Sequence, residues 1–152
     1  MLANRNAYPV FLLGATEEVV NKTAEVVLAQ NAGLKLAGVH HGYFWDDEQA
    51  VVELIRNSGA RLLFVAITSP KKENFINKWR DQLGVDFVMG VGGTFDVVAG
   101  KVSRAPLWMQ NAGLEWLYRV FQEPGRMWKR YLLTNSAFAW LLVKEKLKRG
   151  RS

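Results

Sequence analysis

YPVFLLG, residues 8–14, is a compact apolar run that ends in glycine, and it predicts a buried β-strand. Residues 16–31 then have the pattern of a helix, because Thr16 can cap it and Glu17 and Glu18 suit its first turn. The apolar stripe that this helix would bury consists of Val19, Val20, Ala24, Val27 and Leu28. The chain therefore opens with a strand that is followed at once by a helix.

The same alternation continues to residue 91. Further strands are predicted at 35–40, 61–67 and 87–91. A helix at about 46–58 would bury Val51, Val52, Leu54 and Ile55, and a helix starting at Ser69-Pro70 would present Phe75, Ile76, Trp79 and Leu83. Near-continuous apolar strands between helices predict an α/β fold, with a parallel sheet covered by helices on both faces.

Ligands of such sheets bind outside the carboxyl ends of the strands. Three loops leave those ends, HHGYF (40–44), TSPKKE (68–73) and GGTFD (92–96), and we expect them to line one rim.

Length and composition describe an ordinary globular protein. The chain has 152 residues, 49% of them hydrophobic, which suits one domain with a sizeable core. There is no cysteine, which excludes disulfides, thiolate catalysis and cysteine metal sites. The apolar runs fall well short of the ~20 residues that span a bilayer, and no signal-peptide pattern opens the chain. We expect a cytoplasmic protein.

The charge is unevenly distributed. Residues 1–96 hold 9 Lys/Arg and 11 Asp/Glu, whereas residues 97–152 hold 11 and 3. The last third is therefore expected to meet an acidic partner. We divide the chain into an α/β core, 1–111, and a helical basic appendage, 112–152, with two helices broken at Pro124-Gly125 and a third at 136–148.

The stretch GVGGTFD (90–96) is not the dinucleotide fingerprint, because Phe95 stands where the third glycine belongs. Two adjacent glycines after a strand serve either a tight turn or the close approach of backbone to a phosphate. Asp96 could accept a hydrogen bond from a ribose hydroxyl or a base N–H. The pattern leaves both readings open.

Other candidate sites are weaker. Free N–H groups at the start of SPKKE (69–73) would attract anions, beside Lys71 and Lys72, or the segment is a solvated first turn capped by Ser69. Adjacent strand residues point to opposite faces, so His40 and His41 make a poor chelate and we expect no metal. Six acids are conceivable bases, but spacing singles out none of them: Asp46, Asp47, Glu73, Asp96, Glu115 and Glu123.

In the appendage, cations alternate with aromatic residues. Arg119, Arg126, Lys129 and Arg130 lie among Trp116, Tyr118, Trp128 and Tyr131. This combination suits a diphosphate headgroup at a membrane surface, or single-stranded nucleic acid, whose bases would stack on the rings. About half of these aromatic side chains are expected simply to pack on the core.

Four segments resemble, in order and spacing, the WecG/TagA/CpsF glycosyltransferases. They are GYF (42–44), SPKKE (69–73), GVGGTFDVVAGKVSRAP (90–106) and GLEWLYRVFQEPGRMWKRYL (113–132). The resemblance implies a Rossmann-like core that transfers a sugar, N-acetylmannosamine or its uronate, from a UDP-sugar. The acceptor would be N-acetylglucosamine on a polyprenyl diphosphate, in the synthesis of cell-surface polysaccharide or teichoic acid. No metal or other cofactor is implied, and the enzyme would sit at the inner face of the cell membrane.

The resemblance also implies roles for residues. The substrate-binding set is Gly42, Tyr43, Ser69, Lys72, Glu73, Gly92, Gly93, Thr94 and Asp96, and the lipid diphosphate would meet Arg119, Arg126, Lys129 and Arg130. Two positions depart from the family's pattern, which has glutamine at Lys72 and glycine at Thr68.

The family's proposed catalytic aspartate lies in an N-terminal section that we expect to be missing here, which leaves the catalytic residue unknown. A complementing N-terminal chain or a homo-oligomer would cover the sheet edge that this exposes. The alternatives are a non-catalytic homologue and a module that binds nucleic acid or a partner protein, although the resemblance disfavours nucleic acid.

Overall fold

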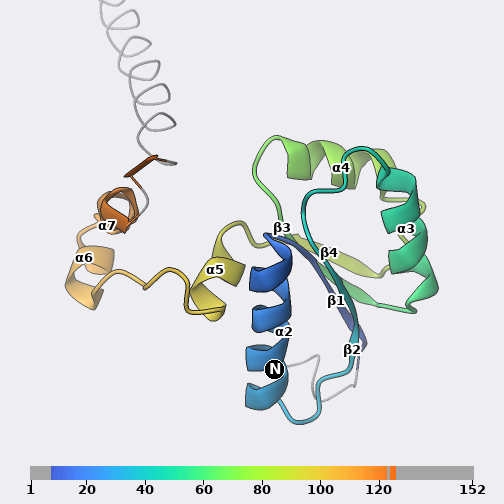
Figure 1. Cartoon of the computed structure of the whole chain (residues 1–152), viewed down its shortest axis with the longest axis horizontal. Coiled ribbons are helices and arrows are strands. Elements are labelled where there is room, and N and C mark those ends of the chain that lie inside the picture. Colours follow the sequence, from blue (N-terminus) through green and yellow to red (C-terminus); the bar gives the residue numbers. More distant parts are fainter. Residues whose placement is uncertain (1–7, 123, 126–152) are drawn as a thin grey trace, which may run out of the picture. The chain divides into compact units, whose positions relative to one another are not determined.

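The computed structural model describes residues 8–122, 124 and 125 (Figure 1). The chain divides into two compact units, with the boundary between Ser103 and Arg104. This boundary reflects contacts within each unit, whereas the division at residue 111 rests on composition and charge.

The first unit is built on a four-stranded, all-parallel sheet. Strand β1 (Val10–Gly14) lies between β2 (Leu36–His40) and β3 (Leu62–Ala66), and β4 (Phe87–Gly90) pairs with β3, giving the order β2-β1-β3-β4. Leu13 is level with His40 on one side and Val65 on the other, so the strands end together. The predicted parallel α/β sheet is confirmed.

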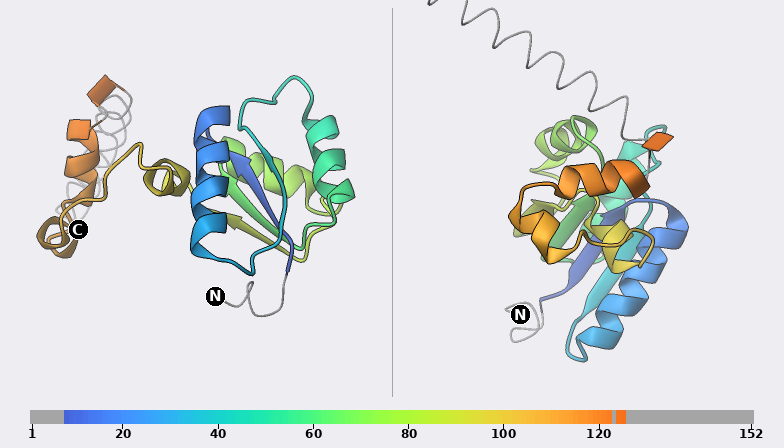
Figure 2. Two further views of the ribbon diagram at one scale, coloured as in Figure 1. Left: turned by 60° about the horizontal axis from the view of Figure 1, so that its bottom comes forward. Right: turned by 90° about the vertical axis from the view of Figure 1, so that its left-hand side faces the viewer.

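Helices cover the two faces of this sheet. Helices α2 (Glu17–Gln30) and α5 (Thr94–Val98) lie on one face, and α3 (Glu48–Asn57) and α4 (Lys71–Trp79) on the other (Figures 1 and 2). Alternate strand residues supply the two cores, because successive side chains point to opposite faces. Phe11 and Leu13 pack under α3 and α4, whereas Val10 and Leu12 pack under α2.

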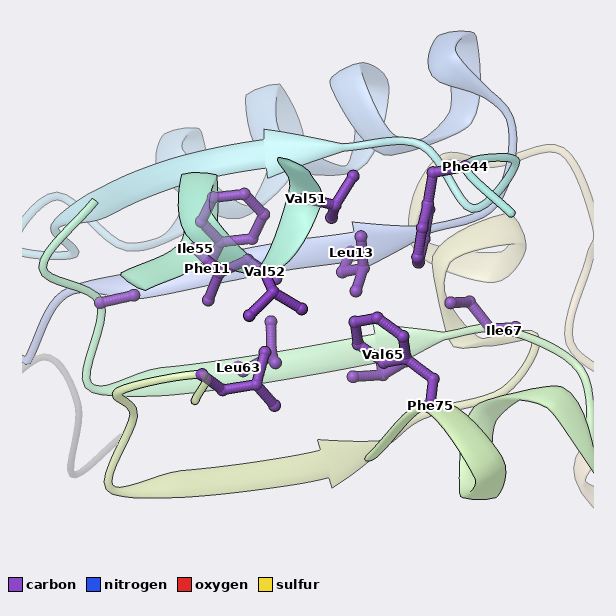
Figure 3. Close-up of a cluster of buried hydrophobic side chains, with 12 residues drawn as sticks. Phe11, Leu13, Phe44, Val51, Val52, Ile55, Leu63, Val65, Ile67 and Phe75 are labelled. Atoms are coloured by element: carbon purple, nitrogen blue, oxygen red, sulfur yellow. The ribbon is translucent and has the colours of Figure 1, made fainter. Parts of the chain in front are cut away.

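The core under α3 and α4 extends past the ends of the strands. Figure 3 shows Phe44 and Ile67 at or past the tips of the strands and Phe75 reaching from α4 over the end of β3, in the same cluster as Leu13 and Val65. Phe75 meets Phe44 edge to face, with their ring centroids 5.2 Å apart. The loops at the carboxyl edge are therefore anchored by core side chains.

Glu48 ties the start of α3 to the end of α4. Its Oε2 accepts hydrogen bonds from Lys78 Nζ at 2.8 Å and from Trp79 Nε1 at 2.7 Å. These bonds, that of Lys78 first, hold the pKa of Glu48 below its ordinary value. The carboxylate is therefore ionised at neutral pH, and the tie is lost only as the pH falls through this lowered pKa.

Most local predictions are confirmed. Thr16 caps α2, since its Oγ1 accepts a hydrogen bond from Val19 N at 3.3 Å. Burial was wrongly predicted for Leu28 in α2 and for Leu54 in α3, whose side chains are 40% and 46% exposed. Leu54 lies at the edge of the stripe that Val51, Val52 and Ile55 form.

The sheet was predicted to be covered by helices on both faces, but its edge strand β4 is partly uncovered. In β4, Phe87 is 52% and Met89 48% exposed. Both lie on the face that α2 and α5 cover, but α5 is only five residues long. Within the described residues of the first unit, no further helix covers this corner of the sheet.

The second unit contains α6 (Leu107–Asn111) and α7 (Glu115–Gln122). The predicted irregular segment 101–110 therefore ends in a short helix, and Pro124 and Gly125, where a helix break was predicted, are themselves helical. The third predicted helix, 136–148, lies outside the described residues. Among the described helices, none combines the length and the apolar character needed to cross a bilayer.

Candidate functional site

The three predicted loops leave the carboxyl ends of β2, β3 and β4, and together we call them the rim (residues 40–44, 68–73 and 92–96). The chain runs from β1 into α2 on one face and from β3 into α4 on the other, so the strand order reverses between β1 and β3. Such a reversal is where parallel α/β sheets bind their ligands.

Backbone hydrogen bonds at Ala15 join the strand ends at this reversal. Ala15 N donates to Ala66 O at 3.0 Å, and Ala15 O accepts from Gly42 N at 2.8 Å. Ala15 has a φ of 58°, which is rare for a residue with a side chain. The ends of β1, β2 and β3 are therefore held in one connected arrangement.

The start of α2 does not favour an anion. In many nucleotide-binding sheets, phosphates sit at the helix that follows the first strand. Here Thr16 already satisfies Val19 N, and the exposed carboxylates of Glu17 and Glu18 occupy the first turn. Phosphates are better accommodated farther along the rim.

The loop after β2 presents an aromatic side chain to solvent. Tyr43 is 69% exposed, and its backbone N–H donates to His41 Nδ1 at 3.1 Å. His40 Nδ1 lies 2.9 Å from His41 O, so both imidazoles take part in shaping the turn. Gly42 is buried, and a Cβ there would lie 3.1 Å from Gly14 Cα, so the loop packs closely on the end of β1.

The loop after β3 holds a small polar network. Ser69 Oγ donates to Glu73 Oε1 at 2.8 Å, and Lys72 Nζ lies 3.1 Å from the same oxygen. Ser69 was predicted as the helix cap, but Pro70 holds that position and makes no side-chain cap, and the Ser69-Pro70 bond is cis. The Ser69 hydroxyl is directed to Glu73 instead.

Glu73 is ionised at neutral pH. The hydrogen bond from Ser69 comes first among the causes that hold its pKa below the ordinary value, followed by its own backbone N–H and Lys72. A general acid needs a raised pKa, and this shift has the opposite sign. Glu73 is therefore suited to orienting Lys72 and Ser69 rather than to donating a proton.

The loop after β4 is a turn with a buried anchor. Gly92 has a φ of 54°, a conformation that favours glycine, and Thr94 Oγ1 donates to Val91 O at 2.6 Å. Phe95 is 4% exposed in the core under α2, so the residue that breaks the dinucleotide fingerprint fixes the loop to the sheet. The glycines of GVGGTFD were predicted to serve either a tight turn or the close approach of backbone to a phosphate, and the turn is present.

Asp96 follows that anchor in the first turn of α5 and is partly exposed. Its backbone carbonyl accepts from Lys101 N at 2.9 Å and Val102 N at 3.1 Å. Within the described part of the chain, its carboxylate has no hydrogen-bond or ion-pair partner. It can therefore accept hydrogen bonds from a ligand.

Sequence reasoning missed Thr23. Its side chain is 1% exposed, and its Oγ1 lies 2.7 Å from Val19 O and 3.1 Å from Phe95 O. It thereby connects α2 to the loop that carries Asp96. The sequence did contain a signal for this residue, because Thr23 places a hydroxyl group within the apolar stripe of the helix predicted at residues 16–31.

The rim is elongated. Adjacent strands lie about 4.8 Å apart, so roughly 14 Å separates the end of β2 from the end of β4. The loop that carries Tyr43 leaves one end of this line and the loop that carries Asp96 leaves the other, while Lys72 and Glu73 belong to α4, which follows β3. The Lys72 side chain extends over Gly90 at the end of β4. The described residues contain no group of three or more metal-ligating side chains. The length of this line and its polar side chains suit an extended polar ligand such as a nucleotide.

Comparison with known families identifies the chain. All of residues 1–152 match one family, described as the glycosyl transferase WecG/TagA/CpsF family. The chain belongs to this family. The resemblance to the WecG/TagA/CpsF glycosyltransferases is thus confirmed, and three of the four segments on which it rested contribute the rim loops.

The residues assigned to the lipid diphosphate in this WecG/TagA/CpsF chain are not part of the rim as described. Arg119 belongs to α7 in the second unit. Arg126, Lys129 and Arg130 lie outside the described residues. Their role remains a prediction from the sequence.

Proposed function

We propose that this glycosyltransferase takes its sugar from a UDP-sugar bound along the rim. The carrying observation is that three of the four segments that resemble the family lie at the carboxyl edge of the sheet, on both sides of the point where strand order reverses. The Asp96 carboxylate, which has no partner among the described residues, can accept from a ribose hydroxyl or a base N–H, and the exposed ring of Tyr43 at the other end of the rim offers an apolar face to the sugar part of the donor.

The proposed acceptor is N-acetylglucosamine linked to a polyprenyl diphosphate, and the transferred sugar is N-acetylmannosamine or its uronate. The acceptor hydroxyl oxygen forms a bond to the anomeric carbon as the bond from that carbon to the diphosphate oxygen breaks. UDP leaves with the bonding electron pair, and a base takes the hydroxyl proton. Cationic side chains stabilise the leaving diphosphate. No metal or other cofactor is part of this proposal.

Asp96→Ala is expected to weaken binding of UDP at least tenfold, because a hydrogen bond to a charged acceptor contributes about 1.5 to 3 kcal/mol. The measurement is calorimetric titration of the purified chain with UDP. Asp81→Ala is the matched control, since Asp81 is an exposed acid beyond α4 and outside the rim. Saturable one-site binding by the unchanged chain and by the control is expected.

Two results would count against this proposal. If the folded wild-type chain does not bind UDP, the donor assignment is wrong for this chain. If it instead binds an oligonucleotide with steep dependence on salt, the alternative of a nucleic-acid module is favoured.

We assign the acceptor side to the basic C-terminal third, at the inner face of the cell membrane. The charge of residues 97–152 attracts anionic headgroups, and the second unit exposes large apolar side chains at Leu107, Trp108 and Phe121. Apolar side chains beside cations are the combination that binds a lipid surface.

Trp108→Ala is expected to reduce binding to anionic lipid vesicles about fivefold or more, because a 65% exposed indole would otherwise be buried at the interface. Vesicle sedimentation at fixed salt measures this loss. Phe87→Ala removes a 52% exposed ring from the first unit and is expected to leave vesicle binding unchanged. An equal loss in both variants would contradict the assignment.

A further inference from the structure

We infer that Lys72 is the residue by which the rim recognises the charge of the donor diphosphate, and that Gly90 sets the position of its ammonium. This inference rests on the proposed binding of a UDP-sugar at the rim. It concerns one contact between two loops, that of Lys72 at the start of α4 with Gly90 at the end of β4.

The side chain of Lys72 lies across Gly90. A Cβ at position 90 would come within 2.6 Å of Lys72 Cδ, 2.7 Å of Cε and 2.9 Å of Nζ. Gly90 is in a strand with an ordinary backbone conformation, because its φ is not positive. Glycine is therefore needed here to make room for the lysine rather than to form a turn.

This placement shelters the ammonium. The Lys72 side chain is 18% exposed, whereas Glu73 is 53% exposed. Partial burial increases the strength of an electrostatic contact, because the surroundings screen it less than bulk water does. Among the described lysines that form ion pairs, Lys22 and Lys78 are both more than half exposed.

Glu73 orients Lys72 without using all of its donors. An ammonium group has three N–H donors, and Glu73 Oε1 takes one of them. Glu73 is itself held by Ser69 Oγ. The side chain of Lys72 is thus confined between Glu73 and Gly90, next to the loop that carries Asp96, and it keeps donors for phosphate oxygens.

The position along the rim matches a diphosphate. Lys72 extends over Gly90 at the end of β4, where the loop to Asp96 begins, so a diphosphate attached to a nucleoside held by Asp96 lies within reach of its ammonium. The start of α2, by contrast, is occupied by the carboxylates of Glu17 and Glu18. Lys72, at the start of α4, therefore supplies the positive charge that the start of α2 lacks. The ligand class is a nucleoside diphosphate.

The experiment compares uridine, UMP and UDP by titration of the whole chain. For the unchanged chain, affinity is expected to rise from uridine to UDP. Lys72→Met keeps most of the side-chain length but removes the charge, and it is expected to weaken UDP binding roughly tenfold while leaving uridine affinity unchanged. Lys35→Met is the control, because the exposed Lys35 precedes β2 at the opposite edge of the sheet.

Gly90→Ala gives a second, independent variant. The added methyl displaces the end of a flexible side chain, so the fold is retained while the ammonium moves. We expect a loss of UDP affinity similar to that of Lys72→Met. The Gly90→Ala, Lys72→Met double variant is expected to bind UDP no more weakly than Lys72→Met alone, because both changes act through the same group.

The outcomes separate the two proposals. If the unchanged chain binds neither uridine nor UDP, the proposed donor itself is wrong. If it prefers UDP to uridine and Lys72→Met keeps that preference, the donor stands and the role of Lys72 is overturned. If the two single variants have additive effects, Gly90 does not act by positioning Lys72.

Discussion

Gly14→Ala is expected to lower the free energy of unfolding by about 3 to 5 kcal/mol, from a backbone contact and an unfavourable φ together. A Cβ at position 14 would lie 2.4 Å from Ala66 O and 2.5 Å from Ala66 C, atoms of the neighbouring strand that cannot swing aside. Gly14 also has a φ of 130°, where side-chain-bearing residues rarely occur. Urea denaturation followed by circular dichroism measures the loss.

Gly59→Ala separates these two causes. Gly59 has a φ of 69°, but a Cβ there would meet nothing within 4 Å. Only the conformational cost of about 1 to 2 kcal/mol is expected. Equal losses at both positions would show that the contact between Gly14 and Ala66 is not what matters.

Gly14→Ala is also expected to disturb the rim. Ala15 follows Gly14 and joins Ala66 to Gly42 through two backbone hydrogen bonds. Forcing β1 away from β3 would displace this junction, so any Gly14→Ala protein that remains folded should bind UDP more weakly. This expectation links the stability of the sheet to the geometry of the site.

Phe75→Ala is expected to destabilise the first unit by about 3 to 5 kcal/mol, the usual cost of deleting a fully buried phenylalanine. Phe75 is 1% exposed and is the buried residue of α4. It packs in the core with Val65 and Ile67 and edge to face on Phe44. Its removal leaves a cavity beneath the helix that carries Lys72 and Glu73.

Phe87→Ala makes the same chemical deletion at a side chain that is 52% exposed in the same unit. We expect a loss of about 1 kcal/mol or less there, and thermal or urea unfolding of both variants tests the difference. A larger loss from Phe87→Ala would mean that the edge of the sheet is covered in solution. It would thereby contradict the exposed state of β4.

Much of the α/β core could be predicted because its signals are local. An uninterrupted apolar run such as 8–14 indicates a buried strand, and Thr16 followed by Glu17 and Glu18 marks a helix start. The failures occur where tertiary packing decides. Leu54 has the right period for burial but lies at the edge of the stripe, and β4 is as apolar as its neighbours but lies at the edge of the sheet.

The site was predicted at the level of loops rather than contacts. Parallel strands place their carboxyl ends at one edge, so residues 40–44, 68–73 and 92–96 were expected to line one rim, and all three loops leave that edge of the sheet. The direction of the Ser69 hydroxyl was not predictable, because Ser before Pro also suits a helix cap. The contact of Lys72 with Gly90 joins residues far apart in the sequence and follows only from the pairing of β3 with β4.

Short segments of the sequence were enough to predict the alternation of strands and helices, the parallel sheet and the family, because apolar runs, caps and motifs are local properties. The packing of distant segments showed that Gly14 and Gly90 allow close approach, whereas Gly92 serves a turn. It also decided that Phe95 and Thr23 anchor the loop that carries Asp96. The physical reason is that the space around a glycine and the partner of a hydroxyl depend on distant segments of the chain, which no local pattern encodes.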